Sequence, residues 1–252
     1  MALTPIDISE EGGVRYLHFG SEWVQGAMRI KRPIDLELSY TREMMAGLLM
    51  RDLDPWPRNI LLIGLGAASL TKFCYWRLPQ SRTTVVEIEP TVVAAARHFF
   101  KLPDDDKRLS VVIDDGAEFI QKSGPYYDYI LVDGYDEDAR TGALDSLPFY
   151  QMCWTRLSES GLIAINLFGR SRKYQPMLNR LTQAFDGRAL AFPSCDSGNV
   201  IAFAARGEAV EVTATKLRSR AAVLAKSMNL DLRPTVTRLE KAQTLIGGML
   251  RI

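Results

Sequence analysis

The sequence is short of the residues that build disulfides and most metal sites. Its 252 residues include only two histidines and three cysteines, which are odd in number, far apart and without a C-x-x-C spacing. These counts support neither a disulfide framework nor a zinc site. They favour a reducing, intracellular setting, so we expect a cytoplasmic protein with no bound metal.

Excess charge and long apolar runs are also lacking. The formal net charge of +1 argues against a general nucleic-acid-binding protein, because such proteins usually carry a basic excess or a basic stripe. No apolar run approaches the ~20 residues that span a bilayer, and no basic-then-apolar segment opens the chain. With 47% hydrophobic and 24% charged residues, the composition is that of a globular domain. We therefore expect neither nucleic acid nor a membrane as a partner.

The polarity pattern changes twice along the chain and predicts three units. Residues 1–34 alternate in polarity, which predicts a small N-terminal β-hairpin or meander that ends at Pro33. Residues 35–206 contain the apolar runs of a main unit, expected to be the nucleoside-binding catalytic domain. Residues 207–252, rich in Leu, Ala, Lys and Arg, predict a C-terminal helical extension of two amphipathic helices.

Within the main unit, an apolar helix is predicted from Leu36 to Met50, and strands alternate with helices from Ile60 onward. The predicted strands span 60–63, 84–88, 109–113, 129–132 and 162–167. Such alternation implies a parallel sheet that helices cover on both faces, with right-handed crossovers. Two further strands, near 189–192 and 200–204, would complete the sheet in antiparallel fashion. The predicted fold class is α/β, with a Rossmann-like, methyltransferase-type doubly wound sheet.

A glycine-rich turn follows the first of these strands. Gly64 and Gly66 allow a tight turn and a close backbone approach, and the helix that follows offers free N–H groups to a polar ligand. A G-x-G spacing also occurs in plain strand-to-helix turns, so by itself it is weak evidence. The two glycines are candidate cofactor-binding residues.

The next two strands end in acids. Glu87 is placed to accept the ribose hydroxyls of a nucleoside, whereas Glu89 suits a solvated helix start. The third strand ends in Asp115 and Gly116, where a carboxylate fits the exocyclic amine of an adenine. Helix capping by Asp114 or Asp115 is the alternative explanation.

The fourth strand, Tyr129–Val132, runs directly into Asp133-Gly134-Tyr135-Asp136. Two carboxylates three residues apart, in a loop at the carboxyl end of a buried strand, can hold a polyvalent cation, and one of them can accept a proton from it. The alternative is a turn in which Asp and Gly serve the backbone and Asp136 belongs to a solvated acidic run. Asp133 is the stronger candidate, because it follows four apolar residues.

In this order, the motifs resemble those of the spermidine synthase (polyamine aminopropyltransferase) family over most of residues 14–206. The family's V-E-I-D strand end, its D-G after the third strand and its D-x-x-D loop correspond to Val86–Glu89, Asp115-Gly116 and Asp133–Asp136. Looser matches are Gln25, Tyr40, Glu43-Met44-Met45, Phe149-Tyr150 and Ser197-Gly198.

The resemblance implies a transferase of polyamine biosynthesis, of the EC 2.5.1 type. It would move an aminopropyl group from decarboxylated S-adenosylmethionine to an amine. The donor is a co-substrate, so neither a permanently bound cofactor nor a metal is expected. Glu87 would hold the ribose, Asp115 the adenine, and Gln25 another part of the donor.

On the acceptor side, the resemblance implies that Asp133 is the catalytic base and that Asp136 and Tyr40 place the amine. A primary amine is mostly protonated at neutral pH, since a Lys-like alkylammonium titrates near ~10.4, so a carboxylate must take its proton before the nitrogen attacks. Two adjacent acids also raise the pKa of one of them, which makes it a better base. A small-molecule amine is the expected partner, and a homodimer or homotetramer is the expected assembly.

The sequence departs from the family at several points, which places it in a divergent branch. The family's turn reads G-G-G-D-G-G, and its Asp, expected to hold the donor's terminal amine, is replaced by Ala67. The aromatic residue of the family's P-T-Y-P-S-G segment is Cys195, and Arg42 introduces a positive charge before Glu43. The acceptor, or even the donor, could therefore differ from putrescine and decarboxylated adenosylmethionine.

Two alternatives stay open. An S-adenosylmethionine-dependent methyltransferase would share the fold, and the missing acid at Ala67 favours it modestly. Arg42 is then the candidate partner for the donor's carboxylate. A non-catalytic nucleoside-binding homologue would bind the same ligand without forming a product.

Overall fold

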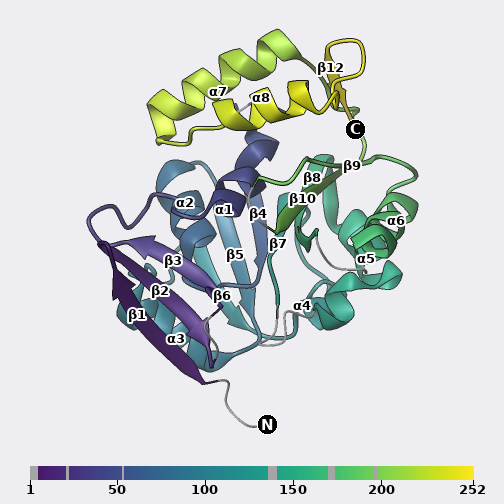
Figure 1. Ribbon diagram of the computed structural model, residues 1–252. Helices are drawn as coiled ribbons and strands as arrows, with labels where there is room; N and C mark the ends of the chain where they lie inside the picture. The colour runs from purple at the N-terminus through teal and green to yellow at the C-terminus, as the bar shows by residue number, and fades with distance from the viewer. Residues whose placement is uncertain (1–4, 21–22, 53, 136–140, 170–173, 196–197) are drawn as a thin grey trace.

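The structure, a computed structural model, describes residues 5–20, 23–52, 54–135, 141–169, 174–195 and 198–252. Within these ranges the strands form three sheets, which have three, seven and two strands (Figure 1). The seven-stranded sheet occupies the centre of the molecule. None of the helices in the described ranges is both long and apolar enough to span a membrane.

The N-terminal sheet is a meander. Its strands β1 (Ile6–Glu11), β2 (Val14–Phe19) and β3 (Gly26–Arg29) pair antiparallel in that order. Gly12 and Gly13 join the first two strands at φ of +57° and +77°, the left-handed pair that a two-residue hairpin turn requires. The small N-terminal β unit expected from the sequence is confirmed.

The central sheet has the strand order β6-β5-β4-β7-β8-β10-β9. The strands are β4 (Asn59–Ile63), β5 (Arg82–Glu87), β6 (Leu109–Ile113), β7 (Tyr127–Val132), β8 (Leu157–Phe168), β9 (Ala189–Ala191) and β10 (Asn199–Ala205). β4 to β8 pair in parallel, whereas β10 is antiparallel to both of its neighbours. The predicted doubly wound sheet with an antiparallel finish is confirmed. Its strand order reverses at β4, and open α/β sheets bind ligands at such a switch point.

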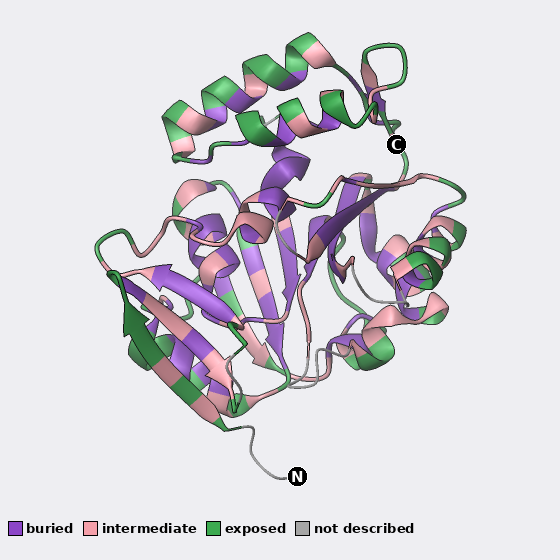
Figure 2. Cartoon of the chain, viewed as in Figure 1, coloured by how far each residue is buried: buried purple, intermediate pink, exposed green. Residues whose placement is uncertain are grey.

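Helices cover both faces of this sheet. One face carries α1 (Ser39–Met44), the 3-10 helix η1 (Met45–Leu49), α2 (Ser69–Arg77) and α3 (Pro90–Phe99), and the other carries α4 (Gly116–Phe119), α5 (Leu147–Arg156) and α6 (Tyr174–Ala184). Alternate residues of a strand enter the two cores, as Leu131 and Val132 of β7 do. Figure 2 shows the central strands largely buried, whereas β1 is exposed along much of its length.

Two helices differ from the sequence prediction. The helix predicted from Leu36 to Met50 is α1 followed by η1. The Tyr129 hydroxyl causes the break: it donates to the carbonyl of Met44 and accepts from the amide of Gly47 at 3.2 Å, so this carbonyl is taken from the α-helical ladder. The sequence pattern did not identify α6, because its two buried residues, Met177 and Leu181, form only a narrow apolar stripe.

The C-terminal segment packs on the face that carries α1. It contains α7 (Ala214–Met228), α8 (Arg233–Lys241) and a small sheet of β11 (Glu211–Thr213) and β12 (Met249–Arg251). In Figure 1 the two helices lie beyond α1, coloured yellow-green and yellow. The two predicted helices are present, whereas the small sheet was not predicted. The division of the chain into three domains stays a prediction.

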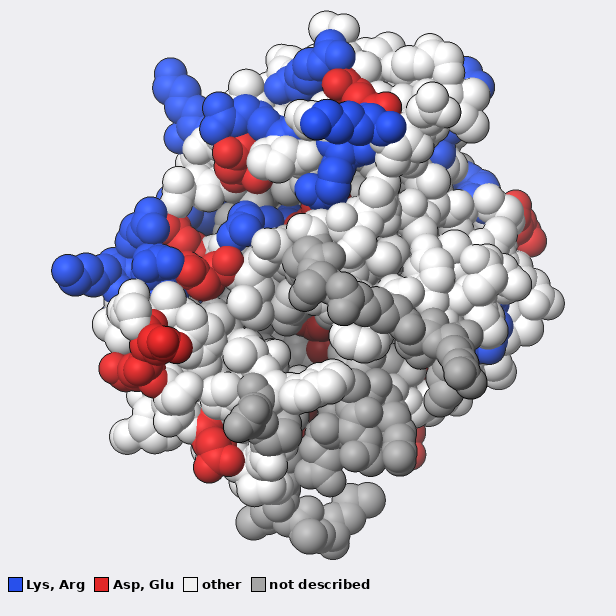
Figure 3. Space-filling model, in the orientation of Figure 1, with Lys and Arg blue, Asp and Glu red and all other residues white. Residues whose placement is uncertain are grey.

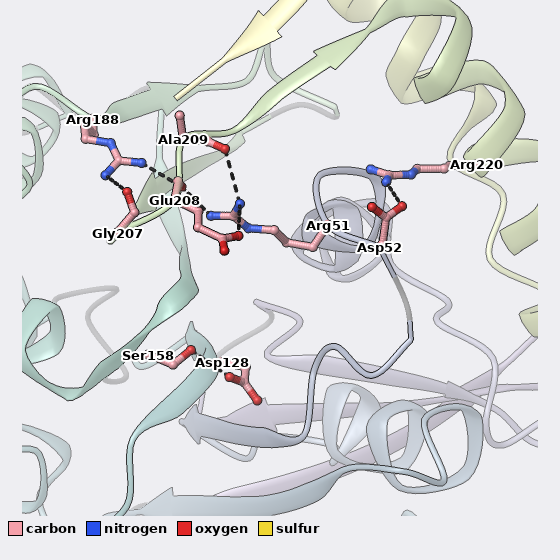
Figure 4. Close-up of polar contacts among 9 residues, drawn as sticks. All are labelled: Arg51, Asp52, Asp128, Ser158, Arg188, Gly207, Glu208, Ala209 and Arg220. Atoms are coloured by element: carbon pink, nitrogen blue, oxygen red, sulfur yellow. Dashed lines mark hydrogen bonds and ion pairs between the residues drawn. The ribbon is translucent and has the colours of Figure 1, made fainter.

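Arginines fasten this segment to the rest of the protein (Figure 4). Buried Arg51, which follows η1, donates to the carbonyl of Glu208 at 2.7 Å. Arg220 of α7 donates to the carbonyl of Leu49 at 2.8 Å and pairs with Asp52. The segment is therefore held at Glu208, near its start, and at α7.

Candidate active site

A cavity of about 530 Å³ opens at the carboxyl ends of β4 to β8. All eight predicted site residues that the structure describes line it: Gln25, Tyr40, Gly64, Gly66, Glu87, Asp115, Gly116 and Asp133. The ninth, Asp136, lies outside the described residues. Figure 3 shows a hollow near the centre of one face with acidic atoms inside it. The cavity thus brings together residues from Gln25 to Asp133, which span more than a hundred positions of the sequence.

The glycine-rich turn lies against the loop that follows β7. Gly64 has a φ of +97°, and a Cβ atom added to it would lie 2.2 Å from the carbonyl oxygen of Asp133. Gly66 has a φ of +49° and faces the backbone of Gln25. Only glycine combines this backbone conformation with so close an approach, which explains its presence at position 64.

Glu87 ties the same turn to the end of β5. Its carboxylate accepts from the amide of Leu65 at 2.8 Å and from the amide of Glu89 at 3.0 Å. Burial raises the pKa of Glu87, and these amide hydrogen bonds oppose the rise. Each carboxylate oxygen can accept more than one hydrogen bond, so the group can also receive ligand hydroxyls.

Asp115 caps a helix and lines the cavity as well. Its Oδ1 accepts from the amides of Ala117 at 2.6 Å and Glu118 at 3.3 Å, at the start of α4. Because both of these bonds are made by Oδ1, Oδ2 can still accept a hydrogen bond from a ligand. Helix capping and adenine binding by Asp115 are therefore compatible. The neighbouring Asp114 pairs instead with Lys122.

Asp133 follows β7 and receives hydrogen bonds from two other elements. The Asn166 side chain of β8 donates from Nδ2 to Asp133 Oδ1 at 2.9 Å, and the Tyr40 hydroxyl of α1 also bonds the carboxylate. Burial raises the pKa of Asp133, and both bonds act in the opposite direction. The sequence prediction missed Asn166, although a polar residue inside the apolar run 162–167 was a signal for it.

The helix that carries Tyr40 is held by the C-terminal segment. Buried Glu43 of α1 accepts from the hydroxyl of Thr235 at 2.7 Å and from the guanidinium of Arg238 at 2.5 Å. Arg42 turns the other way: its guanidinium donates to the carbonyl of Leu36 at 2.7 Å. Arg42 is not among the cavity-lining residues, so the structure does not support it as the partner of a donor carboxylate.

Three apolar residues that the sequence prediction did not single out complete the walls. Leu144, in the 3-10 helix η2 (Gly142–Asp145), packs against Gly134 and Gly116, which follow two strand ends. A Cβ atom added to Gly134 would lie 2.6 Å from the Leu144 side chain, and one added to Gly116 would lie 3.3 Å from it. The rings of Trp23 and Phe168 lie 6.1 Å apart and line the same cavity. Such walls suit flat or aliphatic parts of a ligand.

The ionisable side chains that line the cavity are acidic. Its lining includes the carboxyl groups of Glu87, Glu89, Asp115 and Asp133, and no Lys, Arg or His among the residues that the structure describes. In Figure 3, Lys and Arg gather over the C-terminal helices and beside the N-terminal sheet instead. No group of three or more potential metal ligands occurs in the described part of the chain. The lining that the structure describes is therefore acidic.

Comparison with known proteins identifies the family. The family model for the spermine/spermidine synthase domain matches residues 37–179. A polyamine aminopropyltransferase of Chromobacterium violaceum is 37% identical over 251 residues, which cover 100% of this chain and 95% of that protein. The chain therefore belongs to the spermine/spermidine synthase family, and the resemblance seen in the motifs is confirmed.

Solved structures agree on the fold. A spermidine synthase in complex with the transition-state analogue AdoDATO has a TM-score of 0.61 at 21% identity, covering 80% of this chain and 74% of that one. Human methyltransferase-like protein 13 in complex with SAH has a TM-score of 0.68 at 24% identity, covering 76% of this chain and 93% of that one. The two share one fold with this chain, so the fold does not distinguish their reactions.

Proposed function

We propose that the protein transfers an aminopropyl group from decarboxylated S-adenosylmethionine to a small-molecule amine. The observation that carries the proposal is the one-signed cavity, lined by four carboxyl groups and by no cationic side chain of the described residues. The proposed donor is a cation without a carboxylate, and the acceptor is an amine. The bacterial relative is named a polyamine aminopropyltransferase, which agrees with the transferase of polyamine biosynthesis expected from the motifs.

In this reaction Asp133 removes a proton from the acceptor ammonium. The freed nitrogen lone pair attacks the carbon beside the donor's sulfonium, a C–N bond forms, and the C–S bond breaks with its electrons going to sulfur. The products are a longer amine and an uncharged thioether nucleoside. Asp133 supplies the base, while Tyr40 and the cavity walls align nitrogen and carbon, which is where much of the rate arises.

The donor would lie along the ends of β4, β5 and β6. Glu87 would accept the ribose hydroxyls, Asp115 the adenine amine, and Gln25 another part of the donor. Position 67 departs from the family, which has an Asp there. Ala67 is buried against Gly26: a Cβ atom added to Gly26 would lie 2.6 Å from the Cβ of Ala67. We propose that the remaining carboxyl groups of the cavity balance the charge of the donor's amine.

A methyltransferase is the second candidate, because the fold of human methyltransferase-like protein 13 is shared. Its donor carries a carboxylate, which would enter a cavity whose described lining is acidic and lacks Arg42. Calorimetric titration with decarboxylated adenosylmethionine and with adenosylmethionine separates the two. A tenfold preference, about 1.4 kcal/mol, for the decarboxylated donor is expected. Preference for adenosylmethionine would overturn the proposal.

Turnover tests the base. With a panel of amines and the decarboxylated donor, Asp133→Asn should bind donor normally and lose roughly 10²- to 10⁴-fold in kcat. Asp186→Asn is the matched control, because Asp186 is exposed and its φ of +51° suits asparagine. Donor binding without product from any amine would indicate the non-catalytic homologue.

We propose the assembly from the family resemblance, and the location and the excluded partners from the composition of the sequence. We expect a homodimer or homotetramer in the cytoplasm, with no nucleic acid or membrane as partner. Light scattering on a sizing column tests the assembly, and a monomer at micromolar concentration would contradict it.

A further inference from the structure

The sheet register brings Asn166 beside Asp133. β7 and β8 run in parallel with Val132 opposite Ile165, so the next residues of the two chains, Asp133 and Asn166, are neighbours. Leu131 and Ala164 lie two positions before Asp133 and Asn166, and both belong to the core on the side of α1. Since side chains alternate along a strand, the two polar groups point to the same side of the sheet.

The contacts of Asn166 are divided between two parts of the loop after β7. Its Nδ2 donates to Asp133 Oδ1 at 2.9 Å, and its main-chain oxygen accepts from the Tyr135 hydroxyl at 2.5 Å. A carboxylate only accepts hydrogen bonds, so the nitrogen of the amide must face it. Asn166 is 5% exposed, and no described group donates to its buried Oδ1.

An apolar residue of similar size would avoid this unpaired oxygen. Leu162 and Ala164, which share a face of β8 with Asn166, are apolar and buried, so this side of the strand does not itself require a polar group. A buried polar atom left unpaired calls for an explanation other than packing. The bond to Asp133 supplies one.

We propose that Asn166 is a positioning residue, whose amide fixes the plane of the Asp133 carboxylate and favours its ionised form while it is out of water. The inference rests on the proposed role of Asp133 as the base. An ionised, oriented carboxylate can accept a proton at once, whereas a protonated one cannot.

The groups around Asp133 support this role. Burial raises the pKa of Asp133, and the hydrogen bond from Asn166 is the largest influence that lowers it, followed by that from Tyr40. Tyr135, from the same loop, has a raised pKa and stays neutral. The other acids that line the cavity are Glu87, Glu89 and Asp115, while Asp136 lies outside the described residues.

The test compares Asn166→Leu, which removes the donor, with Asn166→Asp, which replaces it by a second acid. Carboxyl carbon NMR follows the titration of Asp133 in each full-length protein, with Asp133→Asn assigning the signal. The midpoint should rise in N166L and rise further in N166D. The acid limb of kcat/KM for the amine should move upward by the same amount, with kcat at neutral pH falling at least tenfold in N166D.

Asn179→Leu is the matched control, because Asn179 is exposed on α6 and accepts a hydrogen bond from Gln175 of the same helix. Equal donor affinity in all variants shows that each is folded, and N166D keeps the asparagine shape if N166L is unstable. An unchanged Asp133 midpoint in N166D would overturn the inference. A midpoint that moves in a protein without turnover would instead reject the proposed function, and with it the part of Asn166 in catalysis.

Discussion

The two halves of the cavity are built in different ways. On the side that we propose for the donor, Glu87 bonds the amide of Leu65, which lies 22 residues away across a single βα unit, and Asp115 caps the helix that it precedes. On the side that we propose for the acceptor, Asp133 is bonded by side chains of β8 and α1, and Glu43 of α1 is bonded by Thr235, 192 residues away. The donor side is thus set by local motifs, and the acceptor side by long-range packing.

This difference has a consequence for specificity. Changes in the C-terminal segment or in β8 can alter the acceptor without disturbing the strand ends that would hold the nucleoside. The departures at Arg42 and Cys195 fall outside those strand ends, whereas Ala67 lies in the turn after β4, where the family's Asp is expected to hold the donor's terminal amine. Four predictions test the separation.

Of the four, Glu87→Gln should give the largest effect. Glutamine has one acceptor oxygen, so it can accept from the amide of Leu65 or from that of Glu89 but not from both, and it offers the ligand no carboxylate. Hydrogen bonds to a charged group contribute about 1.5–3 kcal/mol, so donor affinity should fall roughly ten- to a hundredfold. The KM for the amine at saturating donor should not change. Calorimetry measures the donor, with Glu118→Gln as the exposed control; affinity within twofold of wild type would remove Glu87 from the donor site.

Thr235→Val should act on the other half. It leaves buried Glu43 with one hydrogen bond fewer, which should lower the free energy of unfolding by about 1–3 kcal/mol. It should also raise the KM for the amine, through Tyr40, and leave the donor Kd unchanged. Thr237→Val on the same helix is the control, because this hydroxyl is exposed and bonds within α8. A loss of donor affinity equal to the loss for the amine would show that the two halves are not separate.

Asp115 allows capping and binding to be measured apart. Asp115→Ala should destabilise the protein by about 1 kcal/mol, whereas Asp115→Asn should restore the cap, because asparagine caps as well as aspartate. If the carboxylate accepts the adenine amine, Asp115→Asn should still weaken donor binding. Urea unfolding and calorimetry on both variants give the answer, and full donor affinity in Asp115→Asn would assign Asp115 to capping alone.

The smallest expected effect is a gain in stability. Burial raises the pKa of Asp133 in the folded protein above its ordinary value near ~3.9, so the native state binds this proton more tightly than the unfolded state. Stability should therefore fall as the pH rises through that window, and Asp133→Asn should melt higher than wild type at neutral pH. Thermal melts should show the difference vanishing below about pH 4. A lower melting temperature for the variant at every pH would contradict this sign.

The sequence by itself determined the fold class, the family and the strand-end residues that line the cavity. Apolar runs alternating with helical segments specify a parallel sheet, and the carboxyl ends of such strands must meet at one edge. Gly64, Glu87, Asp115 and Asp133 could be predicted for this reason, since each follows directly from a recognisable strand.

Only the tertiary structure decided what surrounds Asp133 and what holds α1. Asn166 becomes its neighbour through the register of β7 and β8, the α1–η1 break depends on Tyr129, and Arg42 turns away from the cavity toward backbone carbonyls. Asn166 and Asp133 are 33 positions apart, and Tyr129 and Met44 are 85 apart, while the contact of Arg42 depends on the direction of its side chain. Strand pairing and side-chain direction are fixed by packing over the whole chain, and a local pattern of polarity does not contain them.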